Sequence, residues 1–124
     1  PRVAAAVKLD ALGTTFGGGP MACAAIEATI EALEGEDLLA NVRRVGALIR
    51  ERCIVGPVSG HQGAGLLTGL ICTRPARDVH AALLARDILT GTSGDARVLR
   101  LLPPYTLAAE HVELLRAALL DIGA

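Results

Sequence analysis

Aromatic side chains and net charge are both scarce in this sequence. Its 124 residues include one Phe, one Tyr and no Trp, and the formal net charge is −1. Proteins that bind single-stranded nucleic acid stack bases on aromatic faces, and proteins that bind duplexes need a basic surface. The sequence offers neither, so the composition argues against a nucleic-acid partner.

A long apolar run is also absent, although the mean hydropathy is high at +0.47. Gly, Glu, Arg and Asp interrupt each hydrophobic stretch before it reaches the roughly 18 residues that read as a membrane span, so we expect no membrane segment. The chain opens with Pro1, Arg2 and Val3, and 52% of its residues are hydrophobic. These features predict a piece of a longer protein, with an apolar face that another domain or subunit covers.

The three cysteines, Cys23, Cys53 and Cys72, stand 30 and 19 residues apart. An odd number at wide spacing fits neither a disulfide framework nor a zinc site. Each lies among apolar residues, so we expect buried free thiols in a reducing cytoplasm. The three histidines share no metal-ligand spacing with each other or with the cysteines. We therefore expect no metal site, and histidines that lie at the surface.

Helix signals mark four segments. Pro20 suits the first turn of a helix and Gly35 its end, which predicts a helix over 20–35. Asp37 is predicted to cap a second helix, Pro75 to open a third and Thr106 to cap the last. Apolar residues recur every three or four positions and so share a face of each helix. They are Cys23, Ile26, Ile30 and Leu33, then Leu38, Val42, Val45 and Ile49, then Val79 and Leu83, then Val112, Leu115 and Leu119.

Short β-like runs separated by Gly and Pro fill the rest of the chain, at 54–58, 66–72 and 98–102, with a shorter one before the last. The order is therefore helix, helix, strand, strand, helix, short strand, strand, helix. This alternation predicts an α/β fold, a small α+β domain whose helices pack on one face of a small sheet.

The segment from 13 to 21 is the most informative for function. Thr14 and Thr15 precede three consecutive glycines, and Pro20 then begins a helix. Glycine lets a backbone approach a ligand closely, and a helix N-terminus offers unpaired N–H groups to an anion. The segment is neither a Walker A loop nor a dinucleotide fingerprint. It predicts either a phosphate or carboxylate site or a tight connector with an ordinary helix start.

A second candidate is Arg100, a lone charge within an apolar strand. Strand alternation puts Arg100 on the face opposite Leu99 and Leu101. Its guanidinium either points to solvent or forms a fork that binds a carboxylate through two parallel hydrogen bonds.

Four stretches in order resemble the class III (subgroup II) aminotransferases, which use pyridoxal phosphate. The first is Gly-Thr-Thr-Phe-Gly-Gly-Gly-Pro-Met-Ala-Cys-Ala-Ala from position 13. The others are Asp-Leu-Leu-Ala-Asn-Val from 37, Gly-Ala-Gly-Leu-Leu-Thr-Gly from 63 and Val-Leu-Arg-Leu-Leu-Pro-Pro from 98. The Leu-Arg-Leu-Leu-Pro-Pro run is most similar to that of family members acting on acetylornithine.

The resemblance implies roles for particular residues. It implies that the Thr15 hydroxyl, with Thr14 as a helper, reaches the cofactor phosphate of the neighbouring subunit in a homodimer. It also implies that Arg100 holds the substrate α-carboxylate. The chain departs from the family pattern at Gly19, where Asn is usual, and at Gln62, where a basic residue is common.

The family's Schiff-base lysine lies upstream of these motifs, and Lys8, the only lysine, is too close to Thr15 to be that residue. The resemblance therefore implies the C-terminal part of a fold-type I enzyme, inactive when isolated. Residues 1–35 would end the large cofactor-binding domain and residues 36–124 would form the small domain.

The implied activity is a cytoplasmic transamination. An amino group would pass from N-acetylornithine, or a similar ω-amino donor, to 2-oxoglutarate. Ornithine, 4-aminobutyrate and glutamate semialdehyde remain alternative substrates for the same family. An alternative of another class is a non-catalytic α/β binding module.

Overall fold

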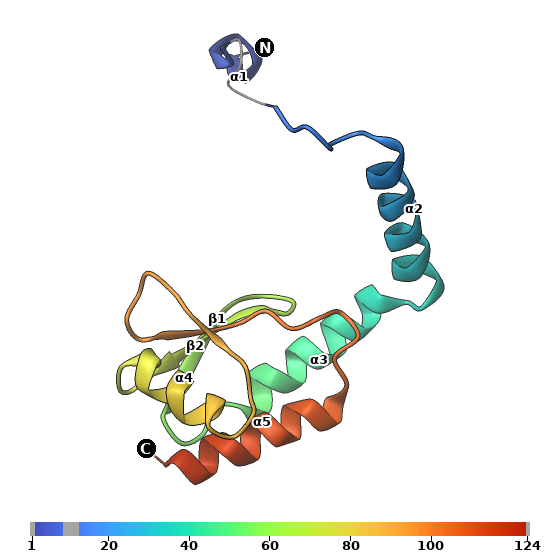
Figure 1. Cartoon of the computed structure of the whole chain (residues 1–124). Helices are drawn as coiled ribbons and strands as arrows, with labels where there is room; N and C mark the ends of the chain where they lie inside the picture. Colours follow the sequence, from blue (N-terminus) through green and yellow to red (C-terminus); the bar gives the residue numbers. More distant parts are fainter. Residues whose placement is uncertain (1, 9–12, 124) are drawn as a thin grey trace.

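The computed structural model describes residues 2–8 and 13–123, and Figure 1 shows how its elements are arranged. In chain order these are helices α1 (Arg2–Ala6), α2 (Pro20–Gly35) and α3 (Leu38–Arg52), strands β1 (Val58–Ala64) and β2 (Leu67–Cys72), helix α4 (Ala76–Leu84), strands β3 (Gly91–Thr92) and β4 (Val98–Leu101), and helix α5 (Ala109–Ile122). Within these described ranges, no helix combines the length and apolar character needed to cross a membrane.

The strands form one antiparallel sheet in the order β1-β2-β4-β3. Leu70 of β2 lies opposite Leu99 of β4, and the next pair along is Gly69 with Arg100. Side chains alternate between the two faces of a sheet. The first pair therefore belongs to the core face, and the second belongs to the outer face.

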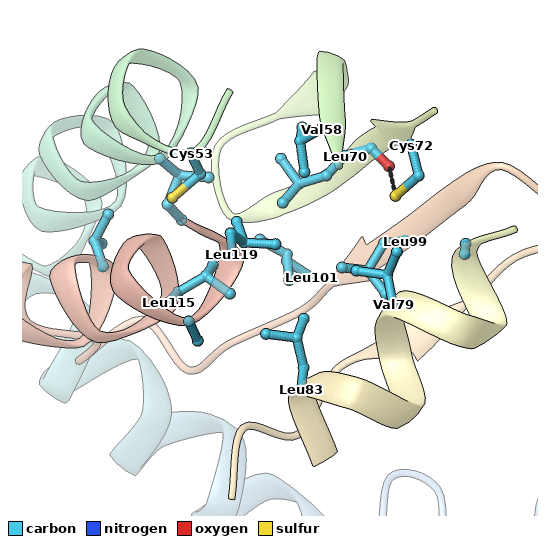
Figure 2. Packing of buried hydrophobic residues seen from close by; sticks show 14 of the residues in the cluster. Cys53, Val58, Leu70, Cys72, Val79, Leu83, Leu99, Leu101, Leu115 and Leu119 are labelled. Atoms are coloured by element: carbon cyan, nitrogen blue, oxygen red, sulfur yellow. Dashed lines mark hydrogen bonds between the residues drawn. The ribbon is translucent and has the colours of Figure 1, made fainter. Parts of the chain in front are cut away.

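The core lies between that sheet face and helices α3, α4 and α5. Figure 2 shows Leu99 of the sheet, Leu83 of α4 and Leu119 of α5 pointing into the same space, and each is fully buried. Burial of a leucine side chain stabilises a fold by about 1.5–3 kcal/mol. The predicted α+β domain with helices on one face of a small sheet is confirmed.

The inward positions predicted for α3, α4 and α5 also hold. Val45, Ile49, Val79, Leu83, Val112, Leu115 and Leu119 are all buried, whereas Leu38 and Val42 are half-buried near the start of α3.

Helix α2 has the predicted bounds but buries none of its residues. It leads away from the sheet, and Met21, Ile26 and Ile30 are largely exposed. The prediction that all three thiols are buried is therefore wrong for Cys23, which is exposed, and right for Cys53 and Cys72. A helical pattern shows which side chains share a face, but burial requires a partner for that face.

The first strand begins later than predicted. Residues 54–57 form a connection that includes Gly56 at φ +55° and Pro57, whose carbonyl accepts the Thr73 N–H at 2.8 Å. Strand β1 instead runs through the polar, glycine-rich segment that follows. An edge strand can form there without an apolar pattern, because its backbone pairs with β2.

The predicted caps of α3 and α5 also need correction. Asp37 occupies the N-cap position of α3, but its backbone is left-handed at φ 47° and its side chain makes no capping hydrogen bond. Helix α5 starts after Ala108 rather than at Thr106, and the Ala108 N–H donates to His111 Nδ1 at 3.2 Å. His111 therefore acts as the N3 residue of a capping box does, by accepting the N–H of the N-cap residue, and no threonine hydroxyl caps the helix.

Candidate functional site

The glycine-rich loop before α2 is a tight turn built around Thr14. The Gly17 N–H donates to Thr14 Oγ1 at 3.2 Å, and Gly18 has a positive φ of +75°. A Cβ atom at Gly17 would lie 2.1 Å from Thr14 Cγ2, so a side chain there would require the Thr14 side chain to rotate. The Thr14 oxygen thus accepts a hydrogen bond within the loop, and its hydroxyl hydrogen stays available to a ligand.

Thr15, in contrast, is exposed, and its hydroxyl bonds to no residue in the described ranges. Helix α2 begins five residues later at Pro20. Its N-cap is Gly19, which supplies no side-chain acceptor, so the first N–H groups of α2 lack a side-chain partner from the N-cap. A donor hydroxyl and a helix N-terminus are thus close in sequence, and both suit a phosphate group.

Arg100 lies on β4 between two glycines. Its register partner on β2 is Gly69, and its register partner on β3 is Gly91. Leu99 and Leu101 on either side are buried, whereas Arg100 is exposed. The predicted alternation along this strand is confirmed.

The guanidinium group lies across Gly91. A Cβ atom at that position would be 3.3 Å from both Nε and Nη2 of Arg100. No ion pair or side-chain hydrogen bond holds this guanidinium among the described residues. Its donors are therefore available to a bound carboxylate.

Arg100 also forms part of the wall of an open pocket of about 410 Å³. The pocket lies between the β3–β4 edge of the sheet and α5, and most of its wall is apolar. The wall also includes Leu89, Thr90, Gly91, Leu102, His111 and Leu114, together with one acidic residue, Asp87. Arg100 is the one arginine among these residues, and its guanidinium suits the carboxylate of a bound ligand.

The chain does not bring Thr15 and Arg100 together. The loop that holds Thr15 precedes the end of α2 remote from α3, whereas Arg100 lies in the sheet (Figure 1). The two candidate residues therefore belong to separate sites within this chain.

The buried thiols are unsuited to nucleophilic chemistry. Burial raises the pKa of Cys53 to about 11, and burial likewise raises the pKa of Cys72. Both thiols therefore stay protonated at neutral pH, and the thiolate is the reactive form. Across the described part of the chain, no three or more His, Cys, Asp or Glu side chains are placed to hold a metal ion.

Two polar contacts escaped the sequence prediction. Asn41 Nδ2 of α3 donates to the carbonyl oxygens of Tyr105 and Leu107, at 2.6 and 3.1 Å. His80, predicted to lie at the surface, is half-buried with Nδ1 2.9 Å from Thr90 Oγ1. The only signal for Asn41 was its place in a family-like segment, and His80 gave none.

Comparison with known proteins identifies the class. The family model described as "Aminotransferase class-III" matches residues 1–122, so the chain belongs to the class III aminotransferases. These are enzymes that depend on pyridoxal phosphate, as the resemblance implied.

Curated relatives narrow the class. An "Acetylornithine aminotransferase 1" of Bordetella bronchiseptica is 41% identical over 106 residues, which cover 82% of this chain and 27% of that protein. An "Acetylornithine aminotransferase" of Streptomyces coelicolor is 39% identical over 111 residues, which cover 86% of this chain and 27% of that protein. An "Ornithine aminotransferase" of Bordetella pertussis is 36% identical over 106 residues, which cover 82% of this chain and 26% of that protein. The chain thus spans about a quarter of the length of these relatives.

Solved structures share the fold. The ornithine aminotransferase from Toxoplasma gondii ME49 superposes with a TM-score of 0.76 at 26% identity, over 98% of this chain and 31% of that one. The acetylornithine aminotransferase from Elizabethkingia anophelis superposes with a TM-score of 0.77 at 25% identity, over 94% of this chain and 31% of that one. The chain therefore has the fold of part of an aminotransferase of the acetylornithine and ornithine type.

Proposed function

We propose that this chain is the C-terminal part of a transaminase that moves an amino group from N-acetylornithine, or a similar ω-amino donor, to 2-oxoglutarate. The observation that carries the proposal is the unpaired guanidinium of Arg100 between Gly69 and Gly91. Both the donor and the oxo acid bear an α-carboxylate, which this fork binds through two parallel hydrogen bonds.

Arg100 orients the substrate. A carboxylate held at two points leaves the rest of the molecule little freedom, and fixed orientation accounts for much of the rate of an enzymatic reaction. Arg100 is exposed in an open pocket, so the two parallel hydrogen bonds, rather than exclusion of water, account for the hold on the carboxylate.

Thr15 and the N-terminus of α2 fit the cofactor phosphate. Thr14 shapes the loop by accepting the Gly17 N–H, and its own hydroxyl hydrogen remains available to help Thr15 donate to the phosphate. When bound, pyridoxal phosphate supplies the electron sink for the chemistry at the substrate's amino-bearing carbon. Because the Thr15 loop lies apart from the sheet, it suits a phosphate held by the neighbouring subunit of a homodimer.

The same proposal covers the organisation of the chain. Residues 1–35 end the large cofactor-binding domain, in keeping with the lack of buried residues in α2. Residues 36–124 form the small domain, which contains the whole buried cluster. The complete enzyme works in the cytoplasm as a homodimer.

Ornithine is the second candidate donor, because an ornithine aminotransferase is 36% identical to the chain. The two donors share the ω-amine and differ at the α-nitrogen, which carries an acetyl group in N-acetylornithine and is a free amine in ornithine. Purified full-length protein should turn over N-acetylornithine with a higher kcat/KM than ornithine. A preference for ornithine would replace the proposed donor.

The isolated 124 residues are expected to be inactive, because Lys8 does not match the family's Schiff-base lysine. Mixing the chain with pyridoxal phosphate, N-acetylornithine and 2-oxoglutarate should yield no glutamate. Glutamate formation that disappears in Lys8→Ala would contradict this assignment.

A further inference from the structure

His80 and Thr90 form a contact for which the proposed function has no role. His80 Nδ1 of α4 and Thr90 Oγ1 lie 2.9 Å apart, and both residues are half-buried. Thr90 immediately precedes β3, whose first residue, Gly91, is the register partner of Arg100. The contact therefore joins helix α4 to the strand beneath the guanidinium.

Helix α4 is held in the core by buried side chains, whereas β3 is held by few contacts. Val79, next to His80, and Leu83, one turn later, are both fully buried in the core. Strand β3 has only two residues, and they pair with β4 alone at the edge of the sheet. So short an edge strand gains little from its ladder, because few backbone hydrogen bonds hold it. A side-chain tie from a buried helix adds a second point of attachment.

The position of β3 determines where the guanidinium can lie. Gly91 approaches Arg100 so closely that an added Cβ would be 3.3 Å from Nε and Nη2. A shift of the β3 backbone toward Arg100 would displace the guanidinium, and a shift away would leave it unsupported. Both displacements disturb a two-point contact with a carboxylate, which tolerates little misplacement.

We propose that the His80–Thr90 contact positions Arg100 for carboxylate binding by fixing β3 beneath its guanidinium. His80 is a positioning residue, since it lies outside the pocket wall and acts through Thr90 and Gly91. Thr90 lines the pocket, and its hydroxyl is engaged by His80, so its role here is that contact. The inference rests on the proposed role of Arg100 and assigns a further determinant of affinity for the α-carboxylate to the same site.

The test uses the full-length holoenzyme and glutarate, a dicarboxylate that competes for the same fork. Thr90→Val removes the hydroxyl at nearly constant volume, and Thr90→Ser retains it. Loss of one hydrogen bond should raise the KM for 2-oxoglutarate and the Ki for glutarate about two- to tenfold, while kcat and the absorption of the bound cofactor stay unchanged. Thr90→Ser should restore both constants.

Two controls separate positioning from general stability. Thr92→Val changes an exposed threonine on the same strand and should leave the KM and Ki unchanged. His80→Phe removes the contact from the helix side. In the double variant with Thr90→Val the two effects should not add, because both substitutions break the same contact.

The outcomes distinguish this inference from the proposed function. An unchanged Ki in Thr90→Val and His80→Phe, with a raised Ki in Arg100→Lys, overturns the positioning role and leaves the carboxylate site intact. An unchanged Ki in Arg100→Lys overturns the proposed function and this inference with it. Additive effects of the two substitutions also overturn the positioning role.

Discussion

The side-chain amide of Asn41 lies 2.6 Å from the carbonyl oxygen of Tyr105 and so ties α3 to the loop that follows β4. The same nitrogen donates to the carbonyl of Leu107 at 3.1 Å, and Arg44 Nη2 donates to Asn41 Oδ1 at 2.6 Å. This loop begins directly after the strand that holds Arg100. One amide therefore links a core helix to the segment that leaves the carboxylate site.

Replacing Asn41 with Ala should destabilise the small domain. The substitution leaves the Leu107 carbonyl, in a half-buried position, without its partner, which costs about 1–3 kcal/mol. Denaturant unfolding of the full-length protein measures the change. Arg43→Ala, at an exposed neighbouring position of α3, is the matched control and should change stability by less than about 0.5 kcal/mol. Equal stability of Asn41→Ala and Arg43→Ala would show that the amide contributes nothing.

Cys53 should make stability depend on pH in the alkaline range. Its pKa is about 11 in the fold, against an ordinary value of 9.0, because burial disfavours the thiolate. The unfolded chain therefore loses this proton at lower pH than the folded chain. The stability that the neutral thiol contributes is complete below pH 9.0 and is lost as the pH rises through about 11.

Unfolding free energies of Cys53→Ala should fall less steeply than those of the unchanged protein over this pH range. Val58→Ala serves as the control, because it also opens space in the core but removes no titratable group. It should lower stability at every pH and keep the original slope. A slope in Cys53→Ala as steep as in Val58→Ala would mean that the thiol does not titrate with folding.

Sequence periodicity predicted most of the core but not what covers each face. Val79, Leu83, Val112 and Leu119 are buried as expected, since their helices meet the sheet within this chain. Cys23 has the same helical spacing yet is exposed, because α2 has no buried contact here. Burial depends on tertiary partners, and local spacing carries no information about them.

In the candidate site, too, local sequence predicted some features, and others depend on tertiary packing. Arg100 stood out because a charge within an apolar strand is unusual, and its exposure on the face opposite Leu99 follows from strand alternation. The contact between His80 and Thr90 could not be predicted, because it depends on how α4 packs beside β3. The short strand predicted before β4 is present as β3, but a two-residue strand carries no pattern that shows what packs beside it.

Thr15→Ala should weaken cofactor retention in the full-length enzyme by roughly 1.5–3 kcal/mol, the contribution of a hydrogen bond to a charged group. Thr15→Ser keeps the hydroxyl and should retain the cofactor. Spectrophotometric titration of the apoenzyme with pyridoxal phosphate measures the affinity. Thr29→Ala is the control, because the Thr29 hydroxyl donates within α2 to the Ala25 carbonyl. Equal cofactor affinity in Thr15→Ala and the unchanged protein would make Thr15 a connector residue only.

Arg100→Lys should lower kcat/KM for the amino donor and for 2-oxoglutarate together, by roughly ten- to a hundredfold. A lysine ammonium provides a point charge and cannot form the two parallel hydrogen bonds of a guanidinium. Each half-reaction is measured separately by single-turnover absorption changes of the cofactor. Arg77→Lys, at an exposed position of α4, is the control and should leave both half-reactions unchanged. A lower melting temperature with both half-reactions intact would make Arg100 a structural residue.

Gly91→Ala tests whether the absence of a side chain beneath Arg100 matters for substrate binding. The added methyl would lie 3.3 Å from two guanidinium atoms, which is tight enough to move the end of a flexible side chain. Gly91 does not have a positive φ, so alanine adds no backbone strain there. Stability should therefore change by less than about 1 kcal/mol, while the KM for 2-oxoglutarate rises several-fold. Gly94→Ala is the matched control, since no atom lies within 4 Å of its added methyl and its φ is not positive. If Gly91→Ala and Gly94→Ala have the same KM as the unchanged enzyme, the carboxylate is not bound by a guanidinium resting on Gly91.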